Sequence, residues 1–245
     1  QAEDGIRDSV IGLVGSEMCI RDRCGRLAIF SPPESFSELF GVDQVIDYSP
    51  SYNIPPTLAI PTCRLDIEGH RELLTMRWGL VPHWSKGPDS RFSMFNARAE
   101  TVHEKPAFRG AFRKQRCLIP ADGFYEWSQA NGKQPYFIHR RDNAPLVFAG
   151  LWEQWRGEND ESIDSCTIIV TEANEQMQAL HDRMPVILRQ RQFNDWLNPE
   201  YDQIDDLRDM LKPYAAGDLE IYPVSRDVNS PKNDRAGLIE RVETA

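Results

Sequence analysis

The chain has 245 residues, with 28 Lys and Arg against 38 Asp and Glu, a formal net charge of −10 and 40% hydrophobic residues. This length and composition are typical of a globular chain with a sizeable core, and they exclude disordered and fibrous proteins. No apolar run approaches the roughly 20 residues that a membrane-spanning helix needs, so no membrane partner is expected. The acidic total argues against nucleic-acid binding by the chain as a whole.

The cysteine content points to a reducing environment. The five cysteines include no Cys-x-x-Cys pair. Their odd number and their spacing argue against a disulfide framework and against a zinc ribbon. We therefore expect a cytoplasmic protein with no metal and no cofactor.

Residues 1–23 differ from the rest of the chain. They contain no periodic apolar face, and they lack the basic and apolar regions of a signal peptide. The segment is either a disordered tail or a foreign one, since it resembles translated adapter sequence found in some assembled genomes. We exclude it from the fold, which leaves one domain over residues 24–240 and a C-terminal tail over 241–245.

From residue 24 onward the sequence predicts many short strands and few helices. A helix is expected around Phe36 and Phe40, after the start signal Pro32-Pro33-Glu34-Ser35. Asn131-Gly132 predicts a tight hairpin turn after Glu126-Trp127. Runs rich in β-branched and aromatic residues predict strands over 58–63, 73–78, 136–140, 146–151, 166–171 and 219–224. Further helices are expected over 173–180, 190–197 and 202–211. This pattern indicates an α+β fold, a single domain around an antiparallel, barrel-like β-sheet with a few peripheral helices.

One stretch reverses the overall charge. Between Lys86 and Arg116 there are eight basic and three acidic residues, a local net charge of +5, interleaved with four phenylalanines and preceded by Trp78 and Trp84. Cations follow a phosphate backbone and aromatic rings stack on exposed bases, so this composition suits a single-stranded nucleic-acid groove. The alternative is that the aromatics form core and the charges a solvated face.

Four short motifs carry reactive groups. They are Cys24-Gly25-Arg26, Asn96-Ala97-Arg98-Ala99-Glu100-Thr101, Ala121-Asp122-Gly123-Phe124-Tyr125-Glu126-Trp127 and His181-Asp182-Arg183-Met184-Pro185. Together they supply a thiol, an amide, a guanidinium, a carboxylic acid and an imidazole from distant parts of the chain, as assembled active sites do. Each also has a structural interpretation: Cys24 as a buried apolar residue, His181 at a helix C-terminus, Glu126 paired with a surface cation, and Asn96 in a turn.

With Tyr52-Asn53-Ile54-Pro55-Pro56, Arg77-Trp78-Gly79-Leu80-Val81-Pro82 and Val224-Ser225-Arg226-Asp227-Val228-Asn229, these motifs resemble the SOS-response associated peptidase (SRAP) family of abasic-site processing proteins. The resemblance runs from Cys24 to about Glu240. It implies a protein that covalently traps abasic sites in single-stranded DNA through an N-terminal cysteine, with associated lyase and self-processing activity.

The resemblance also implies roles for individual residues. Cys24 would supply an α-amine that forms a Schiff base with the lesion's aldehyde and a thiol that closes a thiazolidine ring; an α-amine suits the first step because its pKa of about 7.7–8.0 leaves much of it neutral. Asn96 would orient the reacting groups, and Glu126 and His181 would move protons. Arg98 would hold a phosphate, and the further DNA contacts would be Arg26, Arg77, Asn53, Pro56 and Trp84.

The sequence departs from the family at one decisive place. Arg23 precedes Cys24, so the α-amine of Cys24 lies in a peptide bond in the printed chain. Thiazolidine formation therefore requires Cys24 to become the first residue. Two other hypotheses stay open: a cysteine peptidase with Cys24 as nucleophile, His181 as base and Asn96 as orienting group, and a non-covalent single-strand binder. A monomer is expected.

Overall fold

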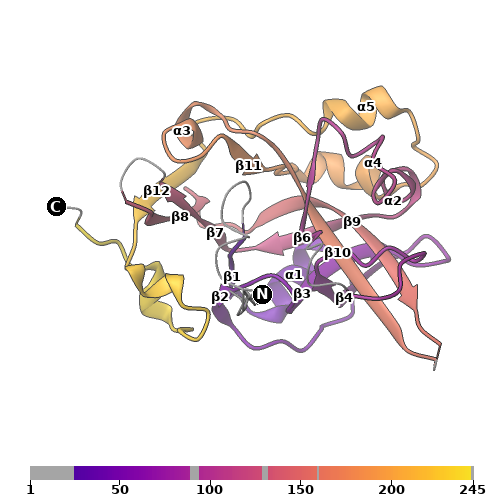
Figure 1. Ribbon diagram of the computed structural model, residues 1–245, viewed down its shortest axis with the longest axis horizontal. Coiled ribbons are helices and arrows are strands. Elements are labelled where there is room, and N and C mark those ends of the chain that lie inside the picture. The colour runs from indigo at the N-terminus through magenta and orange to yellow at the C-terminus, as the bar shows by residue number, and fades with distance from the viewer. Residues whose placement is uncertain (1–24, 89–93, 129–131, 159, 244–245) are drawn as a thin grey trace, which may run out of the picture.

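The computed structural model describes residues 25–88, 94–128, 132–158 and 160–243 (Figure 1). Its strands form two sheets, with the helices at the periphery. The first sheet is antiparallel throughout. Its strands, in order, are β12 (Leu219–Pro223), β8 (Gln134–Arg140), β7 (Gly123–Ser128), β1 (Leu27–Ile29) and β2 (Ser51–Ile54).

The second sheet closes into a barrel. In order around it lie β10 (Ser162–Glu172), β4 (Arg71–Trp78), β3 (Ala59–Leu65), β6 (Arg116–Ala121) and β9 (Leu146–Arg156). The closure is made by β9, which pairs with β10 from Arg156 opposite Ser162 to Gly150 opposite Ile168. The predicted fold class, a single α+β domain around a barrel-like sheet with peripheral helices, is confirmed. The barrel is mixed, because β10 runs parallel to β4 and to β5 (Asn96–Arg98).

Strand β10 is the element that brings distant motifs together. Along one edge it pairs first with β4 and then with β5. Along the other edge it pairs first with β9 and then with β11 (Arg183–Pro185). The C-terminal half of β10 therefore lies between the strand that starts at Asn96 and the strand that follows His181.

The helices are short and lie outside the barrel (Figure 1). Helix α1 (Pro33–Phe40) confirms the first predicted helix; it buries Phe36 and Phe40 and ends at Gly41, whose φ of 64° is the left-handed conformation that favours glycine. The remaining helices are α2 (Arg109–Lys114), α3 (Glu175–Gln178), α4 (Phe193–Leu197) and α5 (Ile204–Asp209). Helices therefore form within the three other predicted ranges, but each is shorter. Within the described ranges, no helix is long and apolar enough to cross a membrane.

The predicted hairpin is confirmed by the pairing of its two strands. Trp127 in β7 lies opposite Pro135 in β8, and Ser128 lies opposite Gln134. Gly132 lies in the turn and has a φ of 60°. Asn131, the other residue of the predicted turn, lies outside the described residues.

The described cysteines belong to the core. Cys63, Cys117 and Cys166 are fully buried in the barrel strands β3, β6 and β10. Burial raises the pKa of Cys63 and of Cys166 to about 12, and it also raises the pKa of Cys117. These thiols stay protonated at neutral pH and serve as apolar packing, since the thiolate is the nucleophilic form.

Candidate active site

The chain that leads into β1 lies beside Glu126. Leu27 pairs with Phe124 of β7, and the Tyr125 N–H donates a hydrogen bond to the Arg26 carbonyl at 3.0 Å. Continuing this antiparallel register by one residue places Gly25 level with Glu126. On the other edge of β1, Leu27 lies opposite Ile54, so the same register places Gly25 near Pro56. Cys24, the predicted nucleophile, directly precedes Gly25 and lies outside the described residues.

Two close approaches fix this arrangement. A Cβ atom on Gly123 would lie 2.8 Å from the Ile138 carbonyl oxygen and 2.3 Å from the Phe137 ring, so only glycine fits at the start of β7. At the neighbouring position the Asp122 carboxylate accepts hydrogen bonds from the N–H groups of Phe30 (2.5 Å) and Ser31 (2.8 Å), just beyond β1. Asp122 thus anchors the far end of β1 to the junction of β6 and β7.

Glu126 is a buried carboxyl group. The residue is 3% exposed, and its Oε1 has no hydrogen-bond partner among the described residues. The pKa of Glu126 is raised to about 8: burial is the main cause, a hydrogen bond from the Trp127 N–H opposes it, and the Asp182 carboxylate adds to it. Glu126 is therefore mostly protonated at neutral pH and is suited to act as a proton donor. This environment rules out the alternative of a surface ion pair.

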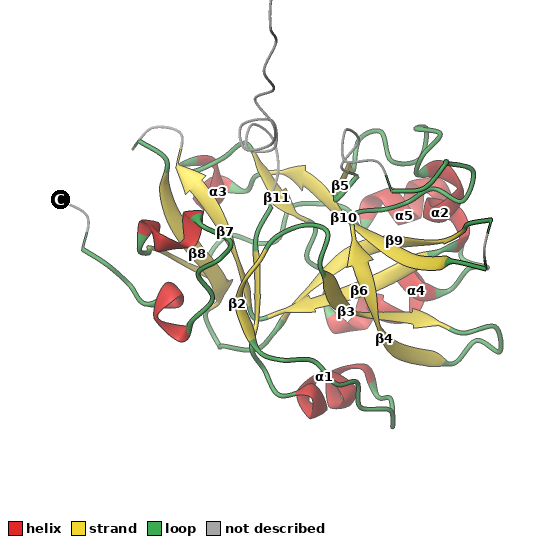
Figure 2. Cartoon of the chain, turned by 60° about the horizontal axis from the view of Figure 1, so that its bottom comes forward, coloured by secondary structure: helices red, strands yellow, loops and turns green. Residues whose placement is uncertain are grey.

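His181 is a second buried group with an unused polar atom. It follows α3, its N–H donates to the Met177 carbonyl at 2.9 Å, and its side chain is 3% exposed. Its Nδ1 accepts a hydrogen bond from the Arg183 N–H at 3.0 Å and lies 3.1 Å from an Asp182 carboxylate oxygen. The other ring nitrogen, Nε2, has no partner in the described part of the chain. His181 lies in the turn that leads into β11 (Figure 2), where Arg183 pairs with Glu172 at the end of β10.

Asn96 and Arg98 belong to β5 rather than to a turn. Asn96 is 5% exposed and pairs with Ile168 of β10, and Arg98 is exposed and pairs with Val170. Val170 in turn lies opposite Pro185 of β11, and an ion pair joins Arg183 to Glu100 across β10. Strand β10 therefore brings together the motif at 96–101 and the motif at 181–185, which the sequence analysis singled out separately.

Three of the predicted DNA contacts are bonded inside the protein. Asn53 is 2% exposed, and its amide donates to the carbonyls of Val228, Ser230 and Asn233, while its Oδ1 accepts from Arg26 at 2.7 Å. Arg77 donates to the Thr57 carbonyl at 2.8 Å. Arg26, Arg77 and Asn53 thus hold the loops around Gly25 in place. Their contact with DNA stays a prediction.

The other predicted contacts reach the surface. Trp84 is 60% exposed, and Pro56 is half-buried at the turn between β2 and β3. In the basic stretch, Arg116 is buried and donates to carbonyls around α2 and α4, and Arg91 lies outside the described residues. The exposed cations of this stretch are Lys86, Arg98, Lys105, Arg109, Arg113 and Lys114. Phe95 and Phe112 of this stretch belong to the core, as does Trp78 before it, because all three are at most 2% exposed.

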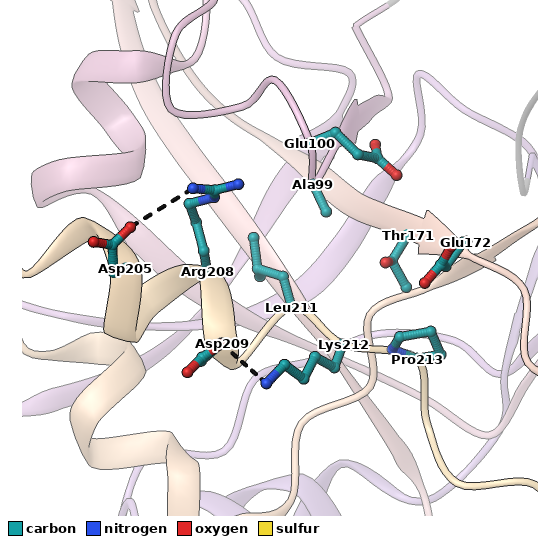
Figure 3. Close-up of a pocket in the computed structure, with 10 residues that line it drawn as sticks. All are labelled: Ala99, Glu100, Thr171, Glu172, Asp205, Arg208, Asp209, Leu211, Lys212 and Pro213. Carbon is teal, nitrogen blue, oxygen red and sulfur yellow. Dashed lines mark ion pairs between the residues drawn. The ribbon is translucent and has the colours of Figure 1, made fainter.

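A pocket of about 410 Å³ lies between α5, the C-terminal end of β10 and the residues that follow β5 (Figure 3). Glu100 and Glu172 line it, and its two cations pair with carboxylates, Arg208 with Asp205 at 3.6 Å and Lys212 with Asp209 at 2.9 Å. This acidic lining does not favour a phosphate. In the ranges that the structure describes, no cluster of His, Cys, Asp and Glu side chains is arranged to hold a metal ion.

Comparison with known proteins identifies the family. Residues 23–231 match the family model described as SOS response associated peptidase (SRAP). The chain belongs to the SRAP family. It is 44% identical to the Bacillus subtilis abasic site processing protein YoqW over 222 residues, which are 89% of this chain and 99% of that protein. It is 32% identical to the Gallus gallus abasic site processing protein HMCES, over 80% of this chain and 67% of that protein.

Solved structures agree with this SRAP fold. A protein from Bordetella bronchiseptica superimposes with a TM-score of 0.71 at 32% identity, covering 82% of this chain and 100% of the other. A Bacteroides thetaiotaomicron protein superimposes with a TM-score of 0.80, covering 90% and 100% of the two chains. At 24% identity, the second likeness supports the fold alone.

Sequence reasoning did not assign roles to Asp122, Asp182 and Arg183, although all three lie in the quoted motifs. The signal for Asp122 was present, since an acidic residue before the glycine of a strand junction suits the capping of neighbouring N–H groups. The ion pair of Arg183 and the effect of Asp182 on Glu126 depend on contacts between distant segments.

Proposed function

We propose that this chain processes abasic sites in single-stranded DNA by forming a covalent link to them through Cys24, once Cys24 is the first residue. The observation that carries the proposal is a buried, unused polar atom on each of two motif residues: Glu126 Oε1, level with the start of β1, and His181 Nε2, in the turn before β11. An unsatisfied buried polar group costs about 1–3 kcal/mol, so such atoms favour a site that a ligand completes. We take the abasic site as the lesion from the names of the relatives YoqW and HMCES, which are both called abasic site processing proteins.

The proposed reaction starts with the ring-opened sugar. The neutral α-amine of Cys24 adds to the C1′ aldehyde, and the resulting carbinolamine loses water to give an imine. Glu126, protonated at neutral pH, donates the proton that converts the departing hydroxyl into water. His181 Nε2 exchanges protons with the amine and the sugar oxygens. Asn96, at the start of β5, orients the reacting groups.

The second step closes a ring. The Cys24 sulfur attacks the imine carbon, its proton passes to the nitrogen, and a five-membered thiazolidine results. Aldehyde and cysteine thus combine with loss of one water. The step is intramolecular and needs no cofactor. Cys63, Cys117 and Cys166 are unsuited to this role because they are fully buried and their pKa values are raised.

The DNA is proposed to lie across the face that carries Arg98, Pro56 and Trp84. Arg98 is exposed at the end of β5 and can hold a phosphate beside the lesion. Pro56 and Trp84 offer apolar surfaces to the neighbouring unstacked bases. Arg26, Arg77 and Asn53 support this face through their hydrogen bonds within the protein. They contact the DNA only at the side of this face that is nearest to the core.

The test compares proteins that start at Cys24 with proteins that carry Cys24→Ala or Cys24→Ser. Each is incubated with a single-stranded oligonucleotide that contains one abasic site. We expect a heat-stable crosslink with Cys24 only. The serine variant keeps the amine and loses ring closure, so its Schiff base is expected to be trapped by borohydride but to be lost on heating. Equal heat-stable crosslinking by either variant would refute the proposal.

A cysteine peptidase remains the alternative, because the family's name includes peptidase and His181 Nε2 is available as a base. A peptidase needs the thiol but not the α-amine. Acetylation of the Cys24 amine is therefore expected to abolish crosslinking under our proposal and to spare peptide cleavage under the alternative. Turnover of peptides by the acetylated protein, without any crosslink by the free-amine protein, would favour the peptidase.

A further inference from the structure

The loop that presents Trp84 is held by the barrel at several points. The Val81 N–H donates to the Ser165 Oγ at 2.8 Å, and the Trp155 indole N–H donates to the Ser85 carbonyl at 2.9 Å. Within the loop, the Ser85 N–H donates to the Pro82 carbonyl at 2.9 Å. The first two bonds are made by β10 and β9, so the backbone on either side of Trp84 is fixed to the barrel.

Glu153 of β9 contacts His83, the residue directly before Trp84. Its carboxylate Oε2 accepts a hydrogen bond from the His83 N–H at 3.2 Å and lies 2.7 Å from the His83 ring Nδ1. The Glu153 side chain is 5% exposed, whereas the His83 side chain is 66% exposed. A buried carboxylate is costly unless its oxygens are bonded, so this contact is a built feature of the fold.

Glu153 is buried, whereas Trp84, the aromatic residue beside its partner His83, is exposed. Trp84 directly follows His83 and is 60% exposed, although tryptophan contributes most when its large apolar ring is covered. A ring presented on a fixed loop binds a partner with less loss of conformational entropy than one on a loose loop. Aromatic rings that are exposed on such loops are suited to stack on unpaired bases.

We propose that Glu153 is a positioning residue for Trp84: through the backbone and ring of His83, it fixes the exposed indole as a stacking surface for a base near the abasic site. The inference rests on the proposed function, because that function places single-stranded DNA on this face. Glu153 itself touches neither DNA nor the reacting atoms.

The test is a double-mutant cycle on DNA affinity. The probe is a single-stranded oligonucleotide with one tetrahydrofuran abasic analogue, which has no aldehyde and so reports binding without crosslinking. Loss of one base–aromatic stack lowers affinity by about 5- to 150-fold, and we expect Trp84→Ala to fall in this range. Glu153→Ala is expected to cause a smaller loss. The double variant is expected to match Trp84→Ala within about twofold, because Glu153 acts only through Trp84.

Three further variants separate positioning from a general effect on folding. His83→Ala removes an exposed ring and is expected to reproduce part of the Glu153→Ala loss. Glu153→Gln keeps an acceptor oxygen and is expected to retain most of the affinity. Glu161→Ala, on the exposed connection between β9 and β10, is the control and is expected to leave affinity unchanged.

Additive losses in the double variant would overturn the proposal, as would full affinity in Glu153→Ala or in Trp84→Ala. Crosslinking to an oligonucleotide with a true abasic site, at saturating concentration, is measured in parallel. The parent protein and all variants start at Cys24, and we expect Glu153→Ala to keep the crosslink yield of the parent protein. A failure of the parent protein to crosslink would instead refute the proposed function, so the two failures are distinguishable.

Discussion

At the scale of single residues, Glu126 links the proposed chemistry to stability. Its pKa of about 8 in the folded protein lies above the ordinary value of 4.5, so the folded state binds more protons than the unfolded state between these pH values. The free energy of unfolding contributed by this group therefore falls as pH rises from about 4.5 to about 8, by up to about 1.4 kcal/mol per pH unit.

Glu126→Gln removes this titration. We expect the variant to gain stability relative to the parent protein as pH rises from 5 to 8, because only the parent has to take up a proton at this position when it folds. Urea unfolding at each pH measures the difference. Glu161→Gln, at an exposed position, is the control and is expected to show a constant difference. A difference for Glu126→Gln that does not grow with pH would contradict the raised pKa. We also expect Glu126→Gln to lose crosslinking, and this loss would support a role of the buried carboxyl group in the reaction.

Thr57 carries backbone strain at the turn beside Pro56. Its φ of 81° lies in the left-handed region, which β-branched residues avoid. The side chain is exposed, so glycine at this position loses little packing. We expect Thr57→Gly to raise the free energy of unfolding by about 1 kcal/mol, since relief of strain exceeds the added entropy of the unfolded chain. Thr75→Gly, at an exposed position within β4, should have the opposite effect in the same urea titration.

At the scale of elements, the sequence predicted those whose signals are local. Helix α1, the β7–β8 hairpin and the strands β4 and β8 have turn residues or apolar patterns at their ends, and they form close to the predicted ranges. Strand β6 was not predicted, because Arg116 and Pro120 interrupt its apolar pattern. The structure explains the first interruption: Arg116 is 2% exposed and donates hydrogen bonds to the carbonyls of Phe112, Trp196 and Tyr201, among others.

For the candidate site too, the sequence predicted what depends on local motifs and did not predict what depends on contacts between distant segments. Asn96, Glu126 and His181 could be singled out because their motifs match a family pattern. Their burial could not, because it depends on β5 and β11 pairing with β10 and on β1 pairing with β7. The same holds for Asn53 and Arg26, whose bonds with each other and with the segment around Val228 join parts of the chain that lie far apart in sequence.

At the scale of the whole molecule, the net charge of −10 opposes DNA binding, whereas the distribution of the charges over the surface favours it. Lys105, Arg109 and Arg113 are exposed at intervals of four residues along α2 and the turn before it. Among the described residues, none of these three takes part in an ion pair, in contrast to Arg189, Arg208 and Lys212, which pair with aspartates. Intervals of four residues place side chains on one face of a helix, so α2 presents a row of cations.

This distribution can be tested by replacing either set of three cations with glutamine, because both changes alter the net charge by the same amount. If DNA follows the row on α2, replacing Lys105, Arg109 and Arg113 should weaken binding of single-stranded DNA. The slope of log K against log salt concentration should then fall by about 2, since each phosphate contact on a single strand contributes about 0.7. Replacing Arg189, Arg208 and Lys212 should leave the slope unchanged. Fluorescence anisotropy at several salt concentrations measures both slopes, and equal changes in the two variants would show that overall charge, rather than the row on α2, governs the approach of DNA.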